Sequence, residues 1–228
     1  MSKVEVCIVV EGPTEQLFVR DVLAPAMSVK GIYLHAARIG SPGHKGGDIR
    51  FERAKNDIGN FLRQRSDTYV STMFDYFRID ADWPGREEIR GKVSSGAALS
   101  AAEKANLMEE ATRQKIVASF GGNNADRRFI PYIAMHEFEA LLFSDPVALA
   151  EKIKVEPERV RQILAECGSP EEINDRPETA PSKRIAALMS GYQKIVMGSS
   201  IAETIGIPAM RRQCPHFDQW LTTLEQLH

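Results

Sequence analysis

Apolar residues in the first third of the chain fall into short β-branched runs separated by segments with helical spacing. The runs predict strands over residues 4–10, 32–39 and 69–77, and the segments between them predict helices from about Thr14 and over residues 49–65. Strands that alternate with helices are typical of an open, mainly parallel sheet flanked by helices. The sequence therefore predicts an α/β fold.

The middle of the chain begins with a polar stretch over residues 78–96, which contains the turn Trp83-Pro84-Gly85. Ser100 and Glu103 form a capping box that opens a helix ending near Phe120. A fourth strand is predicted over residues 129–135, and a helical segment follows it over residues 136–143. This strand extends the predicted sheet.

Short helices account for the rest of the chain. Helix starts are predicted at Asp145-Pro146, at the capping box Ser169-Pro170-Glu171-Glu172, at Ser182 and at Ser200, and residues 217–227 are amphipathic. No long linker separates these helices from the α/β part. We therefore expect an α/β core over residues 1–145 and a helical extension over residues 146–228 that packs on the core.

The composition limits the kind of partner that the chain can hold. Its 228 residues carry a formal net charge of −2, whereas a protein that binds DNA non-specifically is usually basic. Any nucleic acid is therefore expected to be held by a local basic patch or with help from a partner protein. The three cysteines form no C-x-x-C pair, which argues against a zinc site. The sequence shows no signal peptide and no membrane-spanning apolar run, so a cytoplasmic location is expected.

Acidic residues follow three of the predicted strands. Glu11 comes directly after the first strand, Asp75 lies near the end of the third, and Glu137 and Glu139 follow the fourth. The carboxyl ends of parallel strands meet at one edge of a sheet, and carboxylate oxygens suit Mg²⁺ or Mn²⁺. A lone acid of this kind is usually a solvated loop residue or a helix N-terminal residue. Three strand ends together favour a metal site, above all at Asp75, because a carboxylate in an apolar run is costly unless it is paired.

The segment Val9-Val10-Glu11-Gly12-Pro13-Thr14-Glu15 resembles the opening glutamate motif of Toprim domains, the fold shared by topoisomerases, primases and OLD-type nucleases. Four further segments extend the resemblance to a Toprim-related prokaryotic family of unknown function, often encoded beside ATPases in mobile defence loci: Met73-Phe74-Asp75-Tyr76, His136-Glu137-Phe138-Glu139, Pro181-Ser182-Lys183-Arg184 and Cys214-Pro215-His216-Phe217-x-x-Trp220-Leu221. The resemblance covers nearly the whole chain. It implies a Mg²⁺-dependent nuclease with an ATPase partner.

One position departs from the Toprim pattern, which usually has Asp-x-Asp after the third strand. Phe77 stands in place of the second aspartate. Asp80 or Asp82 from the following loop, or the acids of residues 136–139, could replace it. The number of metal ions, one or two, is therefore left open.

Three basic residues are candidates to contact phosphate. Lys183 and Arg184 lie at a predicted helix start, where positive charge gains nothing from the helix dipole, so an anion or carboxylate partner is expected for them. By analogy with Toprim-like nucleases, Lys183 is the candidate to stabilise transition-state charge. Lys45 lies in the glycine-rich segment 40–47, which lacks the Lys-Ser/Thr pair of a Walker A motif and is either a phosphate-binding loop or a flexible loop.

Glu137 and Glu139 are two residues apart, so a helix would direct them to different faces. Glu137 is closer to the strand end and is the predicted site acid. Glu139 is predicted to be structural and to pair with Lys183 or Arg184. His136 beside them is more often a hydrogen-bonded structural residue than a base or a ligand.

These observations favour a Mg²⁺- or Mn²⁺-dependent nuclease or phosphodiesterase that acts on nucleic acid. In this prediction Glu11 is a general base or shared ligand, Asp75 is the primary ligand, and Glu137 or Glu139 is a further ligand. Two alternatives stay open: a non-catalytic subunit that docks on an ATPase, and a phosphohydrolase of small nucleotides.

Overall fold

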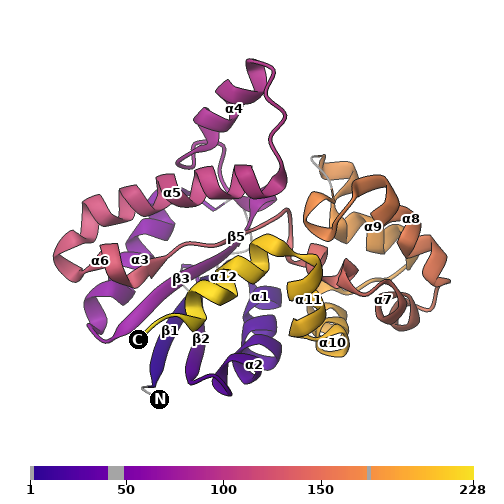
Figure 1. Cartoon of the computed structure of the whole chain (residues 1–228), viewed down its shortest axis with the longest axis horizontal. Coiled ribbons are helices and arrows are strands. Elements are labelled where there is room, and N and C mark those ends of the chain that lie inside the picture. The colour runs from indigo at the N-terminus through magenta and orange to yellow at the C-terminus, as the bar shows by residue number, and fades with distance from the viewer. Residues whose placement is uncertain (1–2, 41–48, 174–175) are drawn as a thin grey trace.

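The computed structural model describes residues 3–40, 49–173 and 176–228, and Figure 1 shows how their elements are arranged. The strands are β1 (Val4–Val10), β2 (Ile32–Arg38), β3 (Thr68–Asp75), β4 (Phe129–Ile130) and β5 (Ile133–Ala134). The α-helices are α1 (Pro13–Phe18), α2 (Ala24–Ser28), α3 (Phe51–Gln64), α4 (Arg86–Ser94), α5 (Ala101–Phe120), α6 (Ala125–Arg128), α7 (Pro146–Ile153), α8 (Pro157–Cys167), α9 (Pro181–Leu188), α10 (Lys194–Ile205), α11 (Ile207–Gln213) and α12 (Pro215–Glu225). A π-helical turn (Val19–Leu23) joins α1 to α2, and short 3-10 helices cover Tyr76–Arg78, Gly121–Asn123, Phe138–Ser144, Pro170–Glu172 and Pro177–Thr179.

The strands form one sheet in the order β2-β1-β3-β4, and β5 also pairs with β3. Each strand pairing within the described residues is parallel, which confirms the predicted α/β fold. The register places Val10 beside Arg38 and Met73, and Asp75 beside Ala134. The carboxyl ends of β1, β3 and β5 therefore lie at the same edge of the sheet.

Helices cover both faces of the sheet, as the nearly continuous burial of β1 and β3 requires. Side chains that alternate along β1 divide between two hydrophobic clusters. Val6, Ile8 and Val10 pack in the cluster that contains residues of α1, α2, α10 and α12. Val9 packs in the other cluster, which contains residues of α3 and α5.

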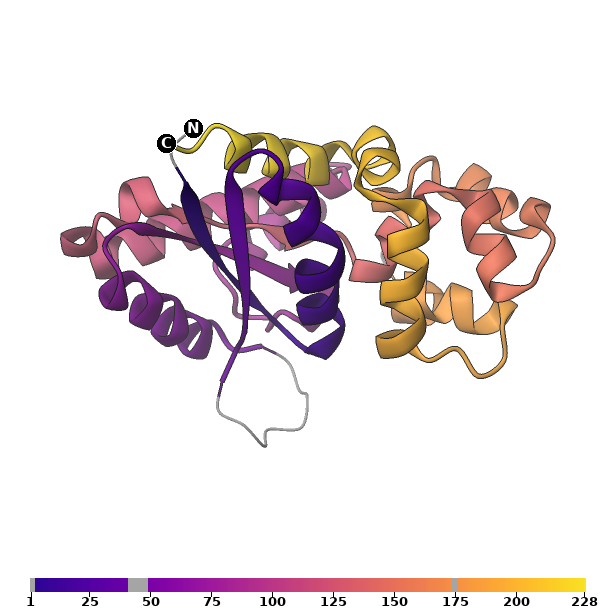
Figure 2. The same cartoon turned by 90° about the horizontal axis from the view of Figure 1, so that it is seen from below.

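The C-terminal helices do not form a separate layer. Residues of α10, α11 and α12 belong to the same hydrophobic cluster as β1 and α1. Helices α7, α8 and α9 gather at one side of the sheet, and α10 lies between them and α1 (Figures 1 and 2). Helix α10 is therefore the element that joins the helical extension to the edge where β1 ends. None of the described helices is both long and apolar enough to cross a membrane.

The predicted fourth strand is divided in two at Pro131 and Tyr132. Proline has no N–H to give to a neighbouring strand, so the ladder breaks there. The side chain of Thr72 fills the gap, because its Oγ1 donates to the carbonyl of Tyr132 at 3.0 Å and accepts from the N–H of Tyr132 at 2.9 Å. The prediction of one continuous strand over residues 129–135 was therefore wrong.

The polar stretch 78–96 contains α4, whose buried residue is Ile89. Two predicted helix starts were wrong. The capping box at Ser169 does not form, because Oε1 of Glu172 instead accepts from the backbone N–H of Ala101 at the start of α5. Ser200 lies in the middle of α10 and does not begin a helix.

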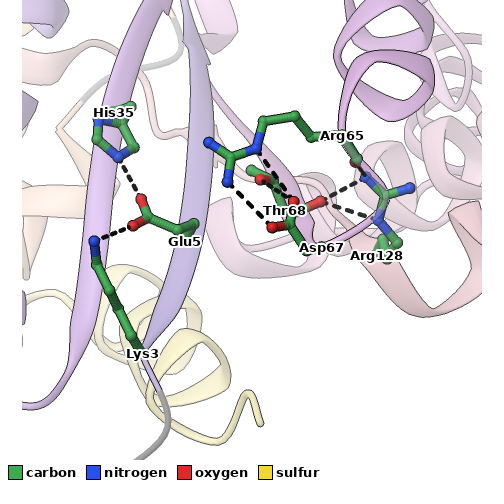
Figure 3. Close-up of polar contacts among 7 residues, drawn as sticks. All are labelled: Lys3, Glu5, His35, Arg65, Asp67, Thr68 and Arg128. Carbon is green, nitrogen blue, oxygen red and sulfur yellow. Dashed lines mark hydrogen bonds and ion pairs between the residues drawn. The ribbon is translucent and has the colours of Figure 1, made fainter.

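The amino ends of the strands are held by ordinary ion pairs (Figure 3). Glu5 on β1 pairs with Lys3 at 2.7 Å and with His35 on β2. Before β3, Asp67 pairs with Arg65 at 3.1 Å, and Arg128 donates to the carbonyl of Thr68. Each carboxylate in this group has a cation of its own. At the carboxyl edge, by contrast, two carboxylates share one cation.

Candidate functional site

Asp75 is the last residue of β3, and none of its surface is exposed. Its Oδ1 accepts a hydrogen bond of 2.9 Å from the backbone N–H of Phe138, which begins the 3-10 helix after β5. Its Oδ2 lies 3.5 Å from Nζ of Lys194. The strand thus delivers the carboxylate to a point between the residues that follow β5 and the first residue of α10.

Lys194 contacts a second buried carboxylate. Its Nζ lies 2.9 Å from Oε2 of Glu139, a side chain with no exposed surface. The Lys194 side chain itself is 35% exposed, so its ammonium sits at the boundary between the protein interior and solvent. One cation therefore serves both Asp75 and Glu139.

Two further acids come from the turn between β1 and α1. Glu11 follows β1, and its Oε1 accepts from Nε of Arg78 at 2.8 Å. Glu15 lies in the first turn of α1 and is buried. A Cβ atom at Gly12 would lie 3.2 Å from Oε2 of Glu15, so this carboxylate folds back over the turn toward the sheet edge. We call Glu11, Glu15, Asp75 and Glu139 the acidic cluster.

Burial and mutual repulsion act on the acidic cluster together. Burial raises the pKa of Asp75 well above its usual value, Lys194 opposes this, and the negative charges of Glu15, Glu11 and Glu139 raise it further. Burial likewise raises the pKa of Glu139 to about 7 against the pull of Lys194. The pKa of Glu11 is also raised by burial, although its hydrogen bond from Arg78 lowers it. For Lys194, burial lowers the pKa, but the carboxylates of Asp75 and Glu139 outweigh that effect and raise it.

The charges do not balance when the acids are ionised. Among the described residues, four carboxylates face two cations, Lys194 and Arg78, which leaves two negative charges in excess. Three carboxylate oxygens are also buried without a hydrogen bond from any described residue: Oε2 of Glu11 and both oxygens of Glu139, of which Oε2 has the ion pair with Lys194. Such oxygens are costly in a protein interior. The cluster therefore has the donor chemistry and the charge to accept a further cation.

Helix α10 holds Lys194 close to the cluster because it packs tightly against its neighbours. A Cβ atom at Gly198 would lie 3.2 Å from the ring of Phe138, 3.4 Å from the hydroxyl of Tyr192 and 3.7 Å from Cγ2 of Thr14. The Tyr192 hydroxyl is buried, and the negative charge of Glu139 contributes to its raised pKa after burial itself. The glycine allows α10 to approach both α1 and the segment that carries Glu139.

The structure reverses the predicted roles of Glu137 and Glu139. Glu139 belongs to the acidic cluster, whereas Oε2 of Glu137 accepts from the backbone N–H of Ser182 at the start of α9. The prediction that Lys183 or Arg184 pairs with Glu139 was wrong, since Lys194 is the partner. Glu137 occupies the amino end of α9 and leaves Lys183 exposed beside it.

The other predicted site residues that the structure describes have contacts apart from the acidic cluster or are exposed. Arg184 pairs with Glu166 at 3.2 Å. Oδ1 of Asp80 accepts from the backbone N–H of Asp82 in a local turn, and Asp82 is exposed, so their role as the second Toprim aspartate stays a prediction. Phe77 instead stacks on the ring of His136, with centroids 5.2 Å apart. Lys45 lies outside the described residues.

His136 is buried among aromatic rings, as expected of a structural histidine. Besides Phe77, its ring meets Tyr76 edge to face with centroids 5.4 Å apart. Nε2 of the other buried histidine, His216, lies 2.9 Å from Oε1 of Glu109, and its ring stacks on Tyr132. Both histidines are thus occupied in packing, and neither belongs to the acidic cluster.

No three His, Cys, Asp or Glu side chains of the described residues are arranged to hold a metal ion as they stand. Within the cluster, the ammonium of Lys194 contacts both Asp75 and Glu139. The buried, unpaired oxygens of Glu11 and Glu139 nevertheless fit a hard cation in their chemistry. The predicted metal site therefore stays a prediction.

Residues 10–225 match the model of a protein family described as a domain of unknown function, DUF4276. The chain belongs to the DUF4276 family. The matched range contains the whole acidic cluster and Lys194. No curated protein and no solved structure matches the chain. The resemblance of its sequence motifs to those of Toprim domains stays a prediction.

The sequence patterns did not indicate Lys194 or Glu15. Lys194 is the first residue of α10, and a positive charge at a helix start is unfavourable, which is also why Lys183 was a candidate. The sequence analysis, however, placed the start of this helix six residues too late, at Ser200. Glu15 was visible as part of the Glu11-Gly12-Pro13-Thr14-Glu15 segment. An acid in a first helical turn is common, and only its burial distinguishes it.

Proposed function

We propose that the protein is a Mg²⁺- or Mn²⁺-dependent hydrolase of phosphodiester bonds in nucleic acid, with a site of the Toprim type. The observation that carries the proposal is the acidic cluster, in which buried carboxylates from two adjacent parallel strands exceed the cations that face them. Phosphoryl-transfer sites commonly hold Mg²⁺ through one or two carboxylates and the substrate phosphates.

Asp75 and Glu139 are the proposed ligands, with Glu11 as a ligand or as the base that takes a proton from water. A bound divalent cation would polarise the phosphate and lower the pKa of a water molecule. Lys194 takes the role first assigned to Lys183, because its ammonium touches the cluster and can stabilise negative charge on the phosphate. Glu15 would not be a ligand, but its buried negative charge would favour the binding of a cation.

The near-neutral charge of the chain supports a partner that delivers the substrate, and an ATPase remains the proposed partner. A second candidate function is a non-catalytic subunit that docks on such an ATPase. The contact of Lys194 with both Asp75 and Glu139 favours this alternative, since an ammonium already neutralises part of the cluster.

The test is cleavage of fluorogenic single-stranded DNA, double-stranded DNA and RNA while Mg²⁺ or Mn²⁺ is titrated. Asp75→Asn should abolish metal-dependent cleavage and leave the fold intact. Asp67→Asn is the matched control, because Asp67 precedes the same strand at the opposite edge and pairs with exposed Arg65 (Figure 3).

Cleavage that is lost in Asp75→Asn and kept in Asp67→Asn would support the hydrolase. Cleavage of dinucleotides or nucleoside triphosphates alone would point to a small-nucleotide phosphohydrolase. If no substrate is cleaved at any metal concentration, the non-catalytic subunit becomes the better proposal.

A further inference from the structure

Lys194 is an unusual partner for the acidic cluster, because its contacts are too few for a purely structural ion pair. A buried ion pair stabilises a fold only when hydrogen bonds satisfy the remaining oxygens. Here one ammonium contacts one oxygen of Asp75 and one of Glu139, and Oε1 of Glu139 is left without a hydrogen bond from any described residue. Glu139 is completely buried, so bulk solvent does not reach this oxygen.

The Lys194 side chain has a route out of the cluster. Its backbone is fixed by α10, which packs through Gly198, Ile201 and Ala202 against the core. The side chain, by contrast, is 35% exposed. A lysine stem has four rotatable carbons and keeps its charged end near water readily. The ammonium can therefore leave the carboxylates while the helix stays in place.

We infer that Lys194 is an internal counter-ion that competes with a divalent cation for Asp75 and Glu139. A divalent cation carries twice the charge of an ammonium and interacts more strongly with the same carboxylates. When it binds, the Lys194 ammonium moves toward solvent, where an incoming phosphate would meet it. The inference rests on the proposed function and adds to it a way of regulating the site. The more strongly Asp75 and Glu139 bind the Lys194 ammonium, the lower is their affinity for the metal.

The first test measures Mn²⁺ binding to the full chain by titration calorimetry. Lys194→Met keeps an unbranched side chain, one atom shorter, and removes the charge, so the Kd for Mn²⁺ should fall by about tenfold or more. Lys194→Arg keeps a cation and should stay close to the parent protein. Lys30→Met is the matched control, because Lys30 forms an ion pair of 2.6 Å with Glu225, a residue of α12 and not of the acidic cluster.

The second test needs no variant and covers the case in which Lys194→Met does not fold. Reductive methylation of lysines in the parent protein, read by peptide mass spectrometry, should modify Lys194 several-fold faster in the presence of Mn²⁺. Methylation of Lys30 should not change. A rate at Lys194 that Mn²⁺ leaves unaltered would overturn the inference.

The outcomes separate this inference from the proposed function. If the parent protein and Lys194→Met bind Mn²⁺ with the same Kd, Lys194 is no competitor, while the metal site of the proposed hydrolase still stands. If neither protein binds Mn²⁺, the inference and the proposed metal site both fail. A weaker affinity in Lys194→Met would make Lys194 a support of the site and would likewise contradict the competition.

Discussion

Tyr132 and Trp220 stack face to face, with ring centroids 4.2 Å apart and planes only 7° from parallel. Tyr132 lies at the break between β4 and β5, and Trp220 comes from α12 near the end of the chain. The indole Nε1 also donates to Oγ of Ser71 on β3 at 2.9 Å. This contact fixes the last helix to the sheet beside the strand that carries Asp75.

Trp220→Ala should lower the free energy of unfolding by about 3–5 kcal/mol, because it removes a buried aromatic side chain and its stacking contact with Tyr132. Trp220→Phe should cost less than Trp220→Ala, since a ring remains and the main loss is the hydrogen bond to Ser71, which is worth about 1 kcal/mol. Chemical denaturation followed by circular dichroism gives both values. Equal losses in the two variants would show that the hydrogen bond, and not the ring, anchors α12.

His216 should make the stability depend on pH. Burial lowers the pKa of His216, but the hydrogen bond and charge of Glu109, with a contribution from Glu171, raise it overall. The protonated form is therefore favoured in the folded state. Its stabilising effect is fully present below the unfolded pKa of about 6.5 and is lost as the pH rises through the higher folded pKa.

The comparison of His216→Gln with the parent protein isolates this effect. The difference in free energy of unfolding should be larger at about pH 6 than at about pH 9. Other titrating groups change alike in both proteins and cancel to first order. A difference that grows toward alkaline pH would show that His216 is folded in its neutral form.

Glu139→Gln and Glu137→Gln should behave oppositely. Glu139→Gln removes a carboxylate of the acidic cluster, so we expect metal-dependent cleavage to be lost. Glu137→Gln should keep cleavage and weaken the start of α9, because a neutral amide accepts less strongly from the N–H of Ser182. Cleavage assays and thermal melts of both variants check this. Loss of cleavage in Glu137→Gln but not in Glu139→Gln would show that Glu137 is the functional acid.

Gly198→Val should push α10 away from α1 and Phe138 and should lower the free energy of unfolding by about 1–3 kcal/mol. Gly91→Val is the control, because Gly91 also lies in a helix but a Cβ atom there meets nothing within 4 Å. Differential scanning calorimetry compares the two. If the free energy of unfolding falls equally in both variants, the close approach at Gly198 is not what holds α10 in place.

The sheet was predictable because each strand had a local signal. Val4–Val10 is a buried β-branched run, and Asp75 was conspicuous as an acid within such a run. The break at Pro131 was harder to predict, because it depends on Thr72 of another strand to complete the hydrogen bonds. Local patterns thus identified the strands and the acids at their ends, whereas a bridging side chain became visible only in the folded chain.

The cation of the site was less predictable than its acids. Lys183 and Lys194 both lie near helix starts, and the local sequence does not separate them. The difference comes from Gly198, which lets α10 approach the sheet edge, and from Glu137, which occupies the start of α9. These are contacts between segments far apart in the chain, so spacing within the sequence could not assign the role.

The position of Lys194 has a consequence for synthesis of the chain. Glu11, Glu15, Asp75 and Glu139 all leave the ribosome before Lys194 does, since they precede it in the sequence. During that interval the nascent sheet carries its acids with no ammonium from α10 to meet them. The carboxylates at this edge of the sheet should therefore stay exposed to solvent or protonated until α10 emerges. Translation that stops before residue 194 should yield a product that proteases or chaperones recognise.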